Sequence, residues 1–169
     1  YDLLKSAGRT FVTKAEDTKY IKDTPEVFRS NAPNTPIERA FWAQTLMRKD
    51  GEEHARELGA MAPSFAPKVI KQDWLVEYQK IAEAYVARLP RGEVVDLFYV
   101  LSSAFVARGL AILLGMNEAS DEEMMEWSQA LIDGAGSFGW QDAPFEGADA
   151  ANRGIHALLD RLQKRHLDA

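Results

Sequence analysis

The stretch Lys49–Pro67, KDGEEHARELGAMAPSFAP, places one histidine in the first turn of an expected helix. Asp50 stands where an N-cap residue accepts hydrogen bonds from free backbone N–H groups, and Glu52 and Glu53 suit the positive end of the helix dipole. A Pro-x-Phe-x-Pro segment then ends the helix. The chain has only three histidines and no cysteine. The role of His54 is therefore the first functional question, although the local pattern alone favours an exposed surface histidine.

The composition is that of one soluble globular domain. The chain has 169 residues, of which 46% are hydrophobic and 27% charged, with a formal net charge of −6. Phosphate-backbone binding needs clustered Lys and Arg, so nucleic acid is not an expected partner. The absence of cysteine removes disulfides, zinc–thiolate sites and a cysteine nucleophile, and it suits the reducing cytoplasm. The first residues, YDLLKSAGRTF, do not have the pattern of a signal peptide.

The rest of the chain predicts a mainly α, multi-helix array with one minor β element. The expected helices are the end of a helix at Tyr1–Ser6 capped by Gly8, then Glu16–Thr24, Lys68–Leu89, Leu97–Leu114, one from Ser120, and Ala148–His166. The β-like run is Arg9–Thr13, and loops are expected at Asn31–Pro36 and Gly134–Gly147.

Two helices carry clear boundary patterns. Leu97–Leu114 is apolar nearly all round and ends at Gly115, but Arg108 and two serines interrupt it. Charged side chains are costly inside a bilayer, so this segment is predicted to be a buried central helix and not a membrane span. Ser120 followed three residues later by Glu123 forms a capping box that begins the next helix.

Several motif matches do not carry chemistry. Gly134–Gly139 fits G-x-G-x-x-G, but a helix is expected before it, where a dinucleotide-binding site requires a strand. Ser137 lacks the strand that a nucleophile elbow needs. No H-E-x-x-H or E-x-x-H pair occurs, so zinc-protease and di-iron sites have no ligand set. No catalytic or metal-ligating residue is predicted in this chain.

The order of motifs resembles the N-terminal half of bacterial cytochrome P450 enzymes, the haem-thiolate monooxygenases. DTPEVFRS (Asp23–Ser30) precedes a Pro-rich loop, then LMRKDGEEHAREL and APSFAP, then a long amphipathic helix and an apolar one. That family has a D-x-P-E-x-F-x-S turn, a D-x-x-x-H element at a helix start, and a P-x-F-x-P exit. The resemblance covers the chain from about Gly8 to Ala169 and implies one partial domain over residues 1–169.

The resemblance implies a role for several residues. His54 would donate a hydrogen bond to a haem propionate, a charge-assisted contact, and Leu46 and Met47 would lie against the porphyrin. Residues 34–45, with Phe41 and Trp42, would form part of the substrate pocket wall. The segment from Leu131 through Gly134 to Phe138, and the loop up to Phe145, would form a mobile roof over an apolar substrate.

The chain departs from this family at two points. Where the family often has a basic residue four positions after the histidine, this chain has Leu58, and Arg48 is the candidate substitute. The thiolate ligand of the iron is also missing, because the chain has no cysteine. The chain is therefore interpreted as part of an enzyme that inserts one oxygen atom from O2 into a small apolar substrate, with electrons from a ferredoxin or flavoprotein. By itself it is expected to be inactive.

Two other interpretations remain open at this point. One is a small all-α interaction module without a cofactor, which binds a partner through apolar helix faces. The other is a haem carrier that ligates iron through a histidine, although all three histidines are expected on helix surfaces.

Overall fold

The computed structural model describes residues 10–168. The protein is mainly α-helical, and the described residues contain no strand. The α-helices are α2 (Ala15–Asp23), α3 (Pro36–Phe41), α4 (Gly51–Met61), α5 (Pro67–Val69), α6 (Leu75–Ala87), α7 (Ala104–Leu113), α8 (Asp121–Ala135) and α9 (Asp142–Asp168). Short 3-10 turns lie at Leu46–Arg48 and Ala62–Phe65, and π-helical turns at Ile70–Trp74 and Phe98–Ser103.

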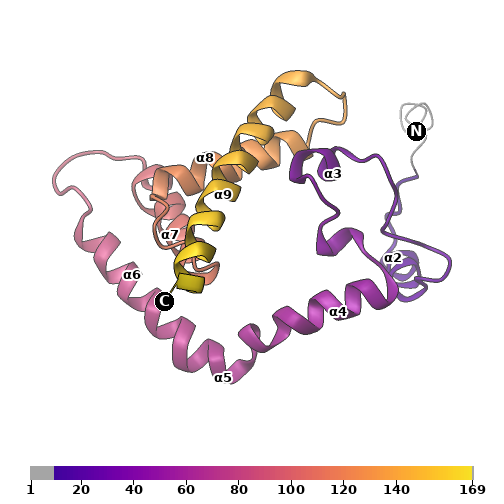
Figure 1. Ribbon diagram of the computed structural model, residues 1–169, viewed down its shortest axis with the longest axis horizontal. Helices are drawn as coiled ribbons and strands as arrows, with labels where there is room; N and C mark the ends of the chain where they lie inside the picture. The colour runs from indigo at the N-terminus through magenta and orange to yellow at the C-terminus, as the bar shows by residue number, and fades with distance from the viewer. Residues whose placement is uncertain (1–9, 169) are drawn as a thin grey trace.

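The helices form an arm and a compact group. Figure 1 shows α4, α5 and α6 running as a long arm, while α3, α7, α8 and α9 gather on the other side of the molecule. The group packs around a core whose buried residues are Ala107, Ala111, Met116, Ala119, Met124 and Leu158. The arm contacts this group where α6 meets α7.

The helices α3, α8 and α9 pack closely at one junction. A Cβ atom at Gly134 would lie 2.9 Å from the Cβ atoms of both Ala40 and Ala148, so only glycine fits at this helix crossing. The buried amide of Asn152 donates hydrogen bonds to the carbonyl oxygens of Ala40, at 2.6 Å, and Ala148, at 2.9 Å. The C-terminal end of α3 is therefore fixed to α9 by small residues and one satisfied polar group.

Two of the expected helix boundaries are confirmed, one at Ser120 and one at Gly115. Ser120 Oγ accepts from the Glu123 N–H at 3.0 Å, and Glu123 Oε2 accepts from the Ser120 N–H at 2.8 Å, so the capping box is present. Gly115 has a φ of +70° and ends α7 in a Schellman motif, in which the Met116 N–H donates to the Ala111 carbonyl at 2.7 Å. The short helix and the long amphipathic helix predicted before α7 are also confirmed.

Other boundaries differ from the prediction. Residues 10–13 form no strand, and the described residues contain no other strand with which they could pair. Arg9, Gly8 and the expected end of a helix at Tyr1–Ser6 lie outside the described residues. The predicted loop at Gly134–Gly147 is shorter, because α8 continues to Ala135 and α9 begins at Asp142. Pro144 is tolerated in the first turn of α9, where its missing N–H is not needed.

The apolar segment predicted as a buried central helix is only partly buried. Its second half contributes Ala107, Gly109 and Ala111 to the interior. Its first half is exposed, with Phe98 at 61% and Tyr99 at 64% of their accessible surface. Apolar composition predicts burial of the whole segment, whereas the described residues pack mainly against its second half. No described helix combines the length and apolar character that a membrane span requires.

The glycine at the helix crossing provides a test of the packing. We expect Gly134→Ala to lower the free energy of unfolding by about 1–3 kcal/mol, because its methyl group would overlap those of Ala40 and Ala148. The control is Gly59→Ala on α4, where a Cβ atom meets nothing within 4 Å and should stabilise the helix by about 0.5–1 kcal/mol. Urea denaturation followed by circular dichroism measures both, and equal effects would contradict the junction.

Candidate functional site

The carboxylate of Asp50 joins two motifs that are distant in the sequence. Asp50 occupies the N-cap position of α4, but its side chain makes no cap hydrogen bond. Its Oδ2 atom instead accepts hydrogen bonds from the backbone N–H groups of Ser30, at 2.9 Å, and Asn31, at 3.1 Å. The local capping prediction is therefore wrong, because the carboxylate satisfies backbone donors that follow the Asp23–Ser30 turn.

A charge cluster fixes the first two turns of α4. The Lys49 ammonium lies 2.9 Å from Glu53 Oε1 and also contacts the Glu57 carboxylate. The hydrogen bonds that Lys49 donates to Glu57 and Glu53 raise the pKa of Lys49, and the one that Glu53 accepts lowers the pKa of Glu53. His54 lies half-buried on the same helix.

The turn before α4 contains two buried polar atoms that lack partners. Thr45 Oγ1 and Arg48 Nε are both inaccessible to solvent and have no hydrogen-bond partner among the described residues. Arg48 Nη2 donates to the Ala32 carbonyl at 3.3 Å, so the guanidinium is held at one end only. Between them, Leu46 is half-buried and Met47 is 73% exposed. Buried polar atoms are rarely left unpaired, so this turn is suited to receive a hydrogen-bonding group.

The residues predicted to shape a substrate pocket lie in a different part of the molecule. Phe41 and Trp42 end α3, and Leu131 and Gly134 belong to α8, so the α3–α8 packing brings these two pairs to one junction. Phe138 follows α8 and is exposed. His54, Leu46 and Met47 lie instead on α4 and the turn before it (Figure 1).

A clasp of three side chains closes the α3–α9 contact. Arg39 donates two parallel hydrogen bonds to the carboxylate of Asp149, at 2.6 and 2.7 Å, and the Trp42 indole N–H donates to the same carboxylate at 2.6 Å. Trp42 also stacks against His156, with ring centroids 5.8 Å apart. The hydrogen bonds from Arg39 and then Trp42 hold the pKa of Asp149 far below its ordinary value. The clasp therefore fixes α3 on α9 with the carboxylate ionised.

The predicted roof is largely helical, because Leu131 and Gly134 belong to α8 and Phe145 belongs to the first turn of α9. Phe145 is only 5% exposed. Its ring lies 5.6 Å from that of Trp140, and the Arg39 guanidinium lies 5.4 Å above it. These three side chains line a cavity of about 320 Å³ together with Asp142 and Glu146.

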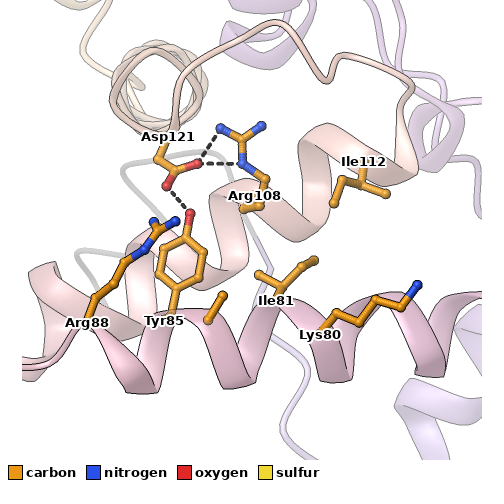
Figure 2. A pocket seen from close by; sticks show the side chains of 8 residues that line it. Lys80, Ile81, Tyr85, Arg88, Arg108, Ile112 and Asp121 are labelled. Atoms are coloured by element: carbon orange, nitrogen blue, oxygen red, sulfur yellow. Dashed lines mark hydrogen bonds and ion pairs between the residues drawn. The ribbon is translucent and has the colours of Figure 1, made fainter.

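A second cavity, of about 450 Å³, lies between α6, α7 and the start of α8. Figure 2 shows the polar network at one end of it, in which the Asp121 carboxylate accepts hydrogen bonds from the Tyr85 hydroxyl and, at 2.7 Å, from Arg108 Nε. Arg108 also donates to the carbonyl oxygens of Asn117 and Ala119, at 3.3 and 3.1 Å. This network was not predicted from the sequence.

The sequence nevertheless carried an indication of this network. A single arginine in an apolar helix predicts a carboxylate partner, because a buried charge is costly unless it is paired. The partner, Asp121, is the first residue of α8, and the capping box at Ser120 already predicted where that helix begins. Burial, and then the hydrogen bond to Asp121, raise the pKa of Tyr85, so its hydroxyl stays protonated and acts as the donor.

Comparison with known proteins identifies no family: no family model matches the sequence. Among residues 10–168, no group of three or more His, Asp or Glu side chains could hold a metal ion.

The clasp predicts a pH-dependent effect of Asp149→Asn. Asp149 has a lower pKa in the folded state than its ordinary value of 3.8, so its contribution to stability is present above pH 4 and is lost as the pH falls further. At pH 7 we expect the substitution to lower the melting temperature by a few degrees. The exposed Asp160→Asn on the same helix is the control. Melting curves at pH 7 and pH 3 should show a difference that shrinks in acid, and a pH-independent difference would contradict the clasp.

Tyr85→Phe tests the network in the second cavity. The substitution leaves Asp121 with one donor fewer, at a cost of about 1–2 kcal/mol in the free energy of unfolding. Because the folded pKa of Tyr85 is raised above 10.0, its contribution is present below pH 10 and is lost as the pH rises through that higher folded value. In an ultraviolet titration, the wild-type protein should show one tyrosine that deprotonates at a higher pH than the others, and the variant should lack it. The exposed Tyr20→Phe is the control, and loss of that high-pH deprotonation there would contradict the assignment.

Proposed function

We propose that this chain is the haem-contacting N-terminal half of a cytochrome P450-type monooxygenase. The observation that carries the proposal is the turn before α4, where Thr45 Oγ1 and Arg48 Nε are buried without partners. This turn carries Leu46 and Met47, which the family resemblance places against the porphyrin, and it leads directly into the helix of His54. An unpaired buried donor is destabilising, so we expect a group from outside the described residues to accept its hydrogen bond.

The residues present fit the carboxylate edge of a haem. Arg48 has a free Nε donor, and His54 lies on the helix that follows directly. Both side chains can donate hydrogen bonds to propionates, and an arginine at this position replaces the basic residue that the family often has where this chain carries Leu58. Leu46 and the exposed Met47 supply apolar atoms for the porphyrin face. When bound through a thiolate from outside this chain, haem iron supplies the chemistry of oxygen activation.

The exposed surface of the chain also supports a partial domain. Its accessible area is 12578 Å², whereas a compact monomer of 18.9 kDa exposes about 8300 Å². Exposed apolar side chains lie on the arm and on the first half of the apolar segment, among them Leu75, Phe98 and Tyr99. A larger parent enzyme would bury this area, and its apolar substrate would lie near the junction of Phe41, Trp42, Leu131 and Gly134. Its electron donor would be a ferredoxin or a flavoprotein.

The same surface favours a second candidate function. Phe98, Tyr99 and Val100 are neighbouring exposed apolar residues on a π-helical turn. Exposed apolar patches of this kind mark protein interaction sites. A small all-α interaction module without a cofactor would use this face to bind its partner.

An absorption spectrum of the natural parent protein, reduced and treated with carbon monoxide, separates the two candidates. The enzyme predicts a red-shifted Soret band that is typical of thiolate ligation. Haem retention during gel filtration should then fall by about tenfold or more in Arg48→Ala and His54→Ala, since each loses a charge-assisted hydrogen bond. His166→Ala, at an exposed position near the end of α9, is the control.

Two results would overturn the proposal. The first is a parent protein without a Soret band, which would favour the interaction module. The second is haem occupancy in both Arg48→Ala and His54→Ala that equals that of His166→Ala.

A further inference from the structure

The second cavity has an apolar floor between charged side chains. Ile81 and Ala84 on α6 and Ile112 on α7 line its centre. Lys80 and Arg88 stand at two ends of the same α6 face, about two helical turns apart (Figure 2). A volume of about 450 Å³ falls within the range of small-molecule sites.

Most of the charges around this cavity are already balanced. Asp121 pairs with Arg108 and also accepts the Tyr85 hydroxyl, so its carboxylate is satisfied and does not need a cation from a ligand. Lys80 Nζ lies 2.7 Å from Glu77 Oε1, which neutralises it.

Arg88 is the cation that remains. No carboxylate of residues 10–168 pairs with it, and its guanidinium lies 5.2 Å from the centre of the Tyr85 ring. This cation–π contact places the guanidinium beside the cavity, and the Tyr85 ring is itself fixed through Asp121. A planar guanidinium with free N–H donors binds carboxylates through two parallel hydrogen bonds.

We propose that this cavity binds an aliphatic monocarboxylate. Its carboxylate would pair with Arg88, and its hydrocarbon chain would lie over Ile81, Ala84 and Ile112. One unpaired positive charge calls for a monoanion, and the apolar floor calls for a hydrocarbon tail. The site is separate from the turn at Thr45–Arg48, and it does not depend on haem binding.

The test is a titration of the 15N-labelled 169-residue chain with sodium octanoate, followed by NMR. We expect saturable shifts at the amides of Ile81, Arg88 and Ile112. 1-Octanol, which has the same tail without the charge, should bind about tenfold more weakly or worse, because it lacks the charge-assisted pair. Arg88→Gln should weaken octanoate by a similar factor, and Arg91→Gln, in the exposed segment after α6, should leave it unchanged.

A second pair of variants keeps the test informative if Arg88→Gln disturbs the end of α6. Ala84→Glu places a carboxylate in the cavity and should abolish octanoate binding by repulsion, whereas Ala87→Glu lies outside the lining and should not. The proposal is overturned if octanoate produces no saturable shift at these amides. It is equally overturned if 1-octanol binds as well as octanoate, or if Ala84→Glu and Ala87→Glu bind octanoate alike.

Discussion

The absence of a side chain at Gly134 is the constraint on which the helix group depends. Because α8 has no Cβ atom there, Ala40 of α3 and Ala148 of α9 both reach its backbone. This approach places Asn152 within hydrogen-bonding distance of the end of α3, and it allows Arg39 to reach Asp149. The segment that follows α3 then carries the turn with the two unpaired polar atoms, and it leads into α4 with His54.

Two half-buried aspartates are satisfied by the same combination of donors. Asp149 and Asp121 each receive an arginine and one aromatic donor, an indole N–H in the first case and a phenol in the second. The first cluster joins α3 to α9, which are distant in sequence, whereas the second joins the consecutive helices α6, α7 and α8. Arg48 lacks such a carboxylate partner, and its unpaired donor is therefore the feature that distinguishes the turn before α4.

The sequence predicted the helical elements well where a local chemical pattern defined them. The capping box at Ser120 and the glycine end at Gly115 were both correct, because each depends on residues within one turn. The loop after Gly134 was predicted too long, because glycines and a proline suggest a loop. In this protein the helix crossing requires Gly134, and the first turn of α9 accepts Pro144. The candidate site was predicted less completely: the haem role of His54 remains a proposal, and the network of Tyr85, Asp121 and Arg108 was missed.

By itself the sequence determined the mainly α class, the helix boundaries that carry caps, and the absence of any cysteine that could ligate iron. Only the tertiary structure decided which side chains meet. Asp50 accepts hydrogen bonds from Ser30 and Asn31 and not from its own helix, and Asp149 pairs with Arg39. These partners depend on how the helices pack. Only packing, likewise, left the aromatic face at Phe98 and Tyr99 exposed. The physical reason is that capping and periodicity act over a few residues, whereas pairing and burial are set by contacts across the whole chain.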